Sequence, residues 1–403
     1  MSAPTPPPGP LLRIVSADSP APPRGIEPYR ALFPLGFAFA LIGGGVWPLQ
    51  ALGLLPYPGP LHVTLMMQGF EQCFVLGFLL TAMPAFTHGE RCRPSELAIA
   101  AVLMIGLGAG ALAGAGAIAQ GAFLLSILFV VATLGRRVWG NPQLPPEEFL
   151  FVGFGMLLGL TGSALLLAAA LGTMPALPPR FAERLLSLGM VLSLVLGVGS
   201  LLVPTFAGLR EPLAIPGVAG PHERKGRRPL YLAFIAAFAS AFGLELAGHA
   251  GLGMGLRATT ATAIGLWVWK LLRLPGRREL HAFVLWISGW LVIAGLWAAT
   301  AFPSHLTAAL HVAFIGGFGL LTLGIATRVV VSHGKHPLEL EKRTLSVFVV
   351  ACVGAALALR LVAELAPARA QDWLAGSGVF WLLAWIAWAA RAVPGLIRTR
   401  AIR

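Results

Sequence analysis

Charged residues are scarce in this chain. Only 11% of its 403 residues are charged and 57% are hydrophobic, whereas soluble domains usually carry about 25% charged residues. A soluble protein of this composition could not cover its surface with polar groups, so we expect a lipid bilayer as its surroundings. The net charge is +13, but the basic residues form short clusters between apolar runs. That pattern is not a nucleic-acid footprint, and it is typical of loops that face anionic lipid.

Cysteine is also rare. The three cysteines, Cys73, Cys92 and Cys352, form no CxxC or CxxCH motif, which argues against a c-type haem attachment and a cysteine-rich zinc site. Cys73 and Cys352 lie in apolar runs, where a buried, small hydrophobic side chain is expected. No nucleophile elbow, P-loop or HExxH motif occurs, so a hydrolase is not expected.

Long apolar runs recur twelve times along the chain. Because a helix needs about 20 apolar residues to cross a bilayer, the sequence predicts an all-α, polytopic transmembrane bundle of about twelve spans. The runs lie near residues 31–53, 61–86, 97–115, 118–135, 149–171, 185–206, 230–248, 254–272, 280–301, 306–331, 344–365 and 373–391.

The chain divides into a tail and one membrane domain. Residues 1–26 are rich in Pro, Ser and Ala and lack the apolar core of a signal peptide, so they are predicted to be a disordered cytoplasmic tail. Residues 27–403 hold the twelve spans. A long basic loop over 207–229 divides the spans into six and six.

Loop charge alternates along the chain and orients the spans. The loops after odd-numbered spans contain only Arg180, Arg184, Arg257 and Arg369. The loops after even-numbered spans contain Arg91, Arg93, Arg136, Arg137, Arg210, Arg224, Lys225, Arg227, Arg228, Arg273, Arg277, Arg278, Lys335, Lys342 and Arg343. Since basic loops stay in the cytoplasm, we predict twelve spans with both termini cytoplasmic.

The second span carries polar residues that are costly in hydrocarbon. Thr64, Gln68, Glu71 and Gln72 fall within one quadrant of a helix at 100° per residue. Two interpretations are open for Glu71: a structural hydrogen bond to a neighbouring helix, or a role with a proton or ligand. Either way, we predict that its carboxyl group faces the bundle and not lipid.

The opposite face of the second span carries small and soft side chains: His62, Met66, Gly69, Cys73 and Gly77. Small residues let another helix approach closely. They would equally leave room for a flat macrocycle beside His62. Met66, one turn below His62, could supply a thioether ligand to a metal, although core packing is the simpler role.

Further ionisable residues lie in other spans. Glu245 lies in the seventh span, and Arg328, near the inner end of the tenth, could extend its side chain to the interface. Arg360 and Glu364 are four residues apart on the eleventh span, a spacing that favours an ion pair with each other.

The histidines separate by side of the membrane. Four belong to the outer half, and several outer imidazoles together favour a metal or haem site, because neutral imidazole is the commonest metal ligand in proteins. For each of these histidines taken alone, a polar residue at the membrane interface is the simpler interpretation. The outer residues are His62, His249, His305 and His311, and the inner ones are His88, His222, His281, His333 and His336.

Four stretches of the chain resemble the NnrS family of twelve-span bacterial membrane proteins. Pro28-Tyr29-Arg30 resembles the family's PFRPFF-type start, and Ser200 to Phe206 resembles GRxIPxFT. The stretch from His62 through Gly69-Phe70 and Gly77 to Thr87 resembles HxHEMxxGF…GFLLTAxPxWT. The stretch from His311 through Thr327-Arg328 and His333-Gly334 to Pro337 resembles HAxxxGxxGxxxLGxxTRxxxGHTGxP.

This resemblance implies a haem-containing protein of the bacterial inner membrane, with copper as a second cofactor, linked to the nitric oxide or nitrosative-stress response. A small gas or redox ligand would be its partner, and no protein partner is implied. His62 and His311 would be the leading ligands, with His249, His305 and His333 as further candidates. The chain departs from the family at Thr64 and Leu65, which replace the second His and the Glu of HxHE, and these losses weaken the copper inference most.

Two other functions stay open from the residues alone. A division into six and six spans and a buried carboxyl group, here that of Glu71, are also typical of transporters and channels. A structural subunit of a larger membrane complex is the third reading.

Overall fold

The computed structural model describes residues 27–87, 89–139, 144–173, 177–178, 180–210 and 227–397. These residues are helical, with no strand among them, as predicted. The predicted tail 1–26 and most of the predicted inner loop, 211–226, lie outside the described residues. Apolar runs become helices in lipid because a helix satisfies its own backbone hydrogen bonds.

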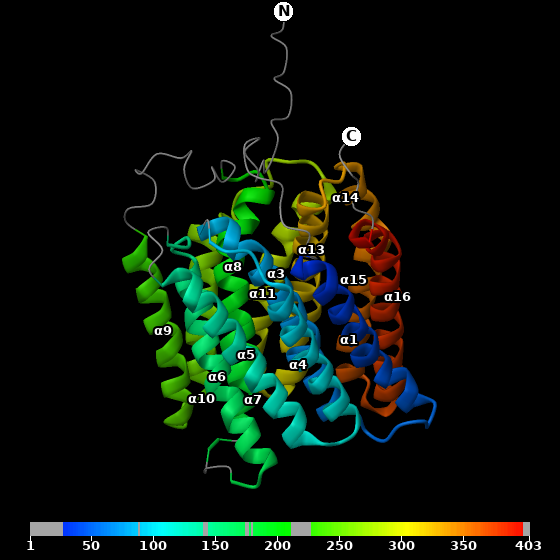
Figure 1. The fold of residues 1–403 in the computed structure, drawn as a ribbon. Coiled ribbons are helices and arrows are strands. Elements are labelled where there is room, and N and C mark those ends of the chain that lie inside the picture. Colours follow the sequence, from blue (N-terminus) through cyan, green and yellow to red (C-terminus); the bar gives the residue numbers. More distant parts are fainter. Residues whose placement is uncertain are drawn as a thin grey trace, which may run out of the picture.

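The helices form one bundle (Figure 1). In chain order the twelve spans are α1 (Pro28–Ala51); α2, η1 and α3 (Gly59–Val63, Thr64–Phe70, Glu71–Thr87); α4 (Pro94–Leu112); α5 (Gly116–Val138); α6 (Phe149–Ala170); α7, η2 and α8 (Phe181–Arg184, Leu185–Val191, Leu192–Phe206); α9 (Arg228–Leu246); α10 and η3 (Ala250–Ala263, Ile264–Val268); α11 (Leu280–Ala301); η4, α12, η5 and α13 (Pro303–His305, Leu306–His311, Val312–Gly319, Leu320–His333); α15 (Val347–Leu365), preceded by α14 (Glu339–Thr344); and η6 and α16 (Pro367–Arg369, Ala370–Ile397).

Eleven of these helical segments are long and apolar enough to cross a membrane. The twelfth, Ala250–Val268, is not among them and carries the charged Arg257. It begins and ends four residues before the predicted run 254–272, which contains Arg257. The loop-charge count, which assigned Arg257 to a loop, was therefore wrong. The close boundary between the third and fourth spans is confirmed, because the chain turns at Gly114, whose φ of 69° suits glycine.

The first and last helices close the bundle. Helices α1 and α16 pack along each other, and they lie side by side in Figure 1. At one end the Arg30 guanidinium donates a hydrogen bond to the carbonyl oxygen of Leu396. The start of α1 and the end of α16 therefore lie at the same end of the bundle, as an even number of spans requires.

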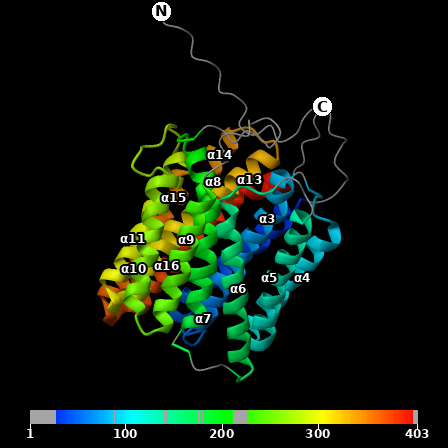
Figure 2. The same ribbon diagram turned by 90° about the vertical axis from the view of Figure 1, so that its left-hand side faces the viewer.

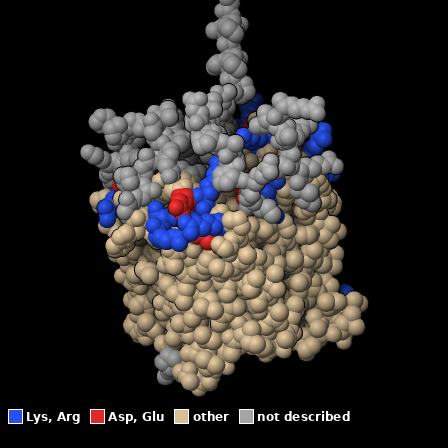
Figure 3. Space-filling view, in the orientation of Figure 1, with Lys and Arg blue, Asp and Glu red and all other residues tan. Residues whose placement is uncertain are grey.

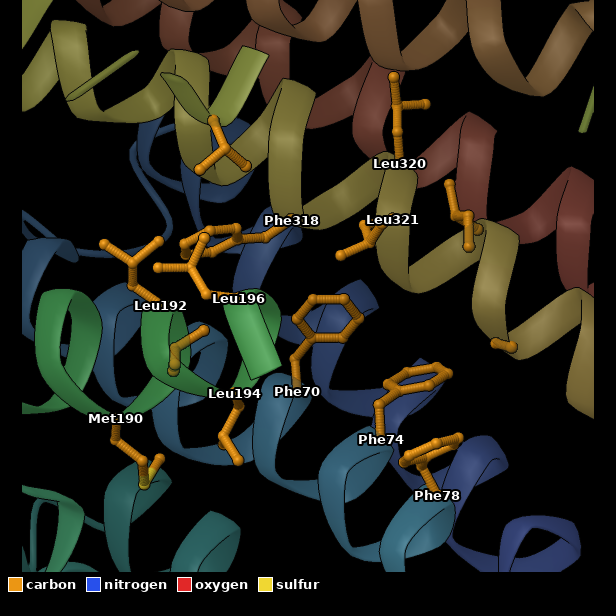
Figure 4. Packing of buried hydrophobic residues seen from close by; sticks show 14 of the residues in the cluster. Phe70, Phe74, Phe78, Met190, Leu192, Leu194, Leu196, Phe318, Leu320 and Leu321 are labelled. Atoms are coloured by element: carbon orange, nitrogen blue, oxygen red, sulfur yellow. The ribbon is translucent and has the colours of Figure 1, made fainter. Parts of the chain in front are cut away.

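The sixth span lies at the centre. In the apolar stretch of the sixth span, 94% of the residues are buried, whereas in that of the eleventh span 28% are buried. Figure 2, turned by 90°, shows its C-terminal part, α8, among neighbouring helices. In the core, Phe70, at the end of η1, and Phe74 and Phe78 on α3 recur at four-residue spacing along the second span, while Phe318 and Leu321 come from the tenth span (Figure 4).

Charged side chains gather at one end of the molecule. On the face shown in Figure 3, Lys, Arg, Asp and Glu lie near the end that carries α14 in Figure 1, and an almost uncharged surface extends below them. Such a broad apolar surface fits a protein embedded in lipid.

Candidate functional site

The second span places His62 two residues before a π-helical segment. Its Nδ1 lies 2.7 Å from the carbonyl oxygen of Gly43 and 3.1 Å from the indole nitrogen of Trp47, both on α1. One ring nitrogen cannot donate to the carbonyl and accept from the indole at once. The carbonyl contact is the shorter, and a carbonyl oxygen only accepts, so Nδ1 carries the hydrogen. The indole then packs at the edge of the ring.

The tenth span holds His311 in the same way. Its Nδ1 lies 2.6 Å from the carbonyl oxygen of Thr307, one turn earlier on the same helix. By the same reasoning Nδ1 is the donor, which leaves the lone pair of Nε2 free in the neutral ring. A hydrogen bond from the second ring nitrogen to a backbone carbonyl is how metal-binding histidines are usually oriented.

The structure brings these two rings together. The imidazoles of His62 and His311 are parallel within 13°, with centroids 6.5 Å apart. Two imidazole nitrogens on one metal ion lie roughly 4 Å apart, about twice a 2.0–2.1 Å bond, and the ring centroids then lie roughly 6 Å apart. The centroid distance of the pair is therefore close to that of two imidazoles that share one metal ion or haem iron.

Both rings stand at the start of irregular helix. The π-helical segment η1 begins at Thr64, and η5 begins at Val312. π-Helical turns are rare and occur frequently at functional sites. They also take up more residues per turn than an α-helix, so they change which side chains face the neighbouring helix.

Aromatic rings and one cation surround the pair. Trp47 contacts His62 edge-on, Phe314 contacts His311 edge-on, and Tyr57 packs against Trp47. The Arg360 guanidinium on α15 acts electrostatically on both imidazoles. Its predicted pair with Glu364 is present but long, at 3.6 Å.

The glycine face below His62 has no room for a macrocycle. A Cβ atom at Gly69 would lie 2.4 Å from the Phe39 ring, and one at Gly77 would lie 2.8 Å from the Phe33 ring, so α1 occupies this face. Close helix packing is the correct interpretation of these glycines. Met66 likewise packs against Gly43, with its sulfur 2.7 Å from where a Cβ would stand.

Thr64 and Leu65 occupy the positions at which the chain departs from the family motif. Thr64 donates its hydroxyl hydrogen to the carbonyl oxygen of Pro60, and Leu65 is completely buried. Within the described part of the chain, no group of three or more His, Cys, Asp or Glu side chains is placed to hold a metal ion.

The other candidate histidines lie apart from the pair. His249 is an exposed residue at the start of α10, and His305 contacts Glu364 at 3.1 Å. His311 lies near the start of the span Pro303–His333, and His333 is its last residue. His333 therefore lies toward the opposite end of the bundle, 3.8 Å from Glu27. His88 and His222 lie outside the described residues.

The polar residues of the second span face the bundle, as predicted for Glu71. The Glu71 carboxylate accepts a 3.5 Å hydrogen bond from the Thr322 hydroxyl on α13. Gln72 donates to the Ser126 hydroxyl at 3.2 Å. Gln68 is 3% exposed. The buried polar side chains thus connect the second span with the fourth and the tenth.

Glu245 belongs to a buried ionic cluster. It accepts hydrogen bonds from Arg257, at 2.6 Å, and from Arg184. The Arg257 guanidinium also lies 3.9 Å above the Phe242 ring. This cluster explains why an arginine can lie inside the eighth span, on α10.

Arg328 does not extend to the interface, contrary to the expectation. It is 4% exposed and forms an ion pair with Glu341. The Glu341 carboxylate also lies 3.6 Å from His281 Nδ1, and these three side chains line a cavity of about 130 Å³. Sequence reasoning missed this cluster, because nothing in the spacing connects the three residues.

The family model for the NnrS protein matches residues 26–400, nearly the whole chain. The chain belongs to the NnrS family. No curated protein and no solved structure matches it. His62 and His311 each open one of the two long stretches that resemble the family.

Two residues of this NnrS site were not predicted. Trp47 and the Gly43 carbonyl, which orient His62, lie on α1. A tryptophan near the end of a membrane span is ordinary at the interface, so no sequence pattern connects it with His62.

Proposed function

We propose that this NnrS-family membrane protein binds one haem group, with His62 and His311 as the axial ligands of its iron. The observation that carries the proposal is the pair of parallel imidazoles, 6.5 Å apart, each oriented by a backbone carbonyl. The Arg360 guanidinium would supply a positive charge to the acidic groups at the edge of the haem. Because Phe39 and Phe33 fill the glycine face, the group would lie at the level of the two rings and not below them.

Haem would supply one-electron redox chemistry. His62 and His311 would hold the iron of this group through the Nε2 lone pairs that their backbone hydrogen bonds leave free. We further propose that the protein acts in the nitric oxide or nitrosative-stress response.

Copper receives less support from the site. The motif position of the second His holds Thr64, and the Glu position holds the buried Leu65. His62 and His311 are the only candidate ligands brought together among the described residues. We therefore propose haem as the main cofactor and treat copper as an outcome of metal analysis.

We also propose that the protein lies in the bacterial inner membrane with both ends in the cytoplasm. The support is the alternation of basic loops together with the shared end of α1 and α16.

An absorption spectrum with metal analysis tests the cofactor proposal. The protein is expressed with ample haem, purified in detergent, and measured for iron, copper and the Soret band. A Soret band with about one iron per chain and a low-spin spectrum is expected. A copper-containing preparation without a Soret band, or one free of both metals, would overturn the haem proposal. Addition of nitric oxide should change the low-spin spectrum only slowly or not at all if both imidazoles stay bound.

A further inference from the structure

Glu71 is buried near the middle of its span without a charged partner. It belongs to the span Gly59–Pro84 and is 6% exposed. Among the described residues, its one polar contact is the 3.5 Å hydrogen bond from the neutral Thr322 hydroxyl. A carboxylate in such a place is costly, because no cation replaces the water that it has lost.

The other buried glutamates are all compensated. Among the described residues, four more glutamates are buried, and each forms an ion pair with arginine. The pairs are Glu96 with Arg136 and Arg137, Glu148 with Arg210, Glu245 with Arg184 and Arg257, and Glu341 with Arg328. Glu71 is therefore the exception within the described chain, which sets its chemistry apart from that of a structural ion pair.

The group that contacts Glu71 is the neutral Thr322 hydroxyl on α13, and the adjacent Gln72 contacts the neutral Ser126 hydroxyl on α5. The charged and titratable side chains of the neighbouring α1, α4, α5 and α13 lie at the ends of those helices. They are Tyr29, Arg30, Glu96, Arg136, Arg137, Arg328 and His333.

Two unpaired hydrogen-bond acceptors lie on the same span as Glu71. The side-chain oxygens of Gln68 and Gln72 are buried and have no donor among the described residues. These residues flank Glu71 on the same span. A protonated carboxyl group would add an O–H donor to this cluster, whereas a carboxylate would add only further acceptors.

We propose that Glu71 is a proton-binding site in the middle of the membrane, a carboxylic acid that is neutral at physiological pH and exchanges its proton with water. The ligand is a proton, and Gln68, Gln72 and Thr322 form the polar surroundings that receive it. Glu71 bridges the second and tenth spans, which also carry His62 and His311. The inference does not depend on bound haem.

Infrared spectroscopy of the purified full-length protein tests the proposal. The C=O stretch of a protonated carboxylic acid is separate from the carboxylate bands, so the difference spectrum between wild type and Glu71→Gln at neutral pH should show the loss of one such band per chain. The band should also shift in D₂O. Glu148→Gln is the matched control: its carboxylate is equally buried but paired, so no acid band should be lost.

Two results would overturn the proposal. One is a difference spectrum in which Glu71→Gln removes a carboxylate band, or no acid band, as would occur if a metal cation were bound there instead. The other is an acid band that does not shift after long exposure to D₂O, which would make Glu71 a sealed structural group. If Glu71→Gln does not fold, Glu71→Asp keeps the acid and should move the band without removing it.

Discussion

The rings of His62 and His311 lie parallel, 6.5 Å apart, although they come from the second and the tenth spans. Each stands near the start of its span, just before or at a π-helical segment, so the two rings reach the same depth. The hydrogen bond between Thr322 and Glu71 connects the same two spans farther down. The pair therefore lies at the top of an interface that both spans share along their length.

Replacement of either histidine should abolish haem retention. In His62→Ala and His311→Ala the iron would lose an axial ligand, so haem content is expected to fall from about one per chain to background or to leave a high-spin remnant. Soret absorbance per protein and the spin-state bands measure this. His249→Ala is the control, since His249 is exposed and away from the pair. Equal haem content and spin state in all three variants would show that the ligands lie elsewhere.

The number of spans and the position of Glu71 were predictable from the sequence, because both follow from the free-energy cost of placing polar groups in lipid. A bilayer demands about 20 apolar residues per helix, and a carboxyl group is too costly to face lipid. Arg257 was misplaced for the same reason: an arginine looks like a loop residue until its partner is seen. Glu245, on the preceding helix, compensates it, and no periodicity reveals that contact.

The faces of the second span were less predictable. A count at 100° per residue placed His62 and Glu71 on opposite faces, yet both contact the tenth span. The π-helical segment η1 lies between them and takes up extra residues per turn. The glycines on the other face pack against Phe39 and Phe33 of α1. Which large side chain packs against a face of small residues depends on how the helices are arranged in space. The sequence does not show that arrangement.

Sidedness can be measured with single cysteines. With Cys73, Cys92 and Cys352 replaced, a cysteine at Pro58 should react with an impermeant maleimide from the outside of intact cells. A cysteine at Gly226, outside the described residues, should react only after the membrane is opened. The reason is that Gly226 belongs to the basic loop 207–229, and basic loops stay in the cytoplasm. Labelling of both positions from the same side would refute the topology.

Cys92 should react slowly and with strong pH dependence. Burial raises the pKa of its thiol to about 11, and the nearby Glu96 carboxylate adds to the effect. The thiolate is the reactive form and appears only as pH rises toward that pKa. In a variant with Cys92 as the sole cysteine, maleimide labelling at pH 7.5 should be about 300-fold slower than for an ordinary thiol of pKa near 8.5. The rate should rise about tenfold per pH unit. A rate equal to that of the unfolded protein at pH 7.5 would contradict this.

Loss of the Glu245 carboxylate should destabilise the bundle strongly. Glu245→Ala would leave Arg257, which is fully buried, without its counter-ion. Breaking one side of a buried ion pair costs about 3–5 kcal/mol, which SDS unfolding of the detergent-purified protein can measure. Glu90→Ala is the matched control, because its pair with Arg93 is 56–65% exposed and should change stability by about 1 kcal/mol or less. Adding Arg257→Met to Glu245→Ala should recover much of the loss, since an apolar side chain of similar length needs no counter-ion. Unchanged unfolding of the single variant, or no recovery in the double variant, would mean that the charge of Arg257 is compensated by another group.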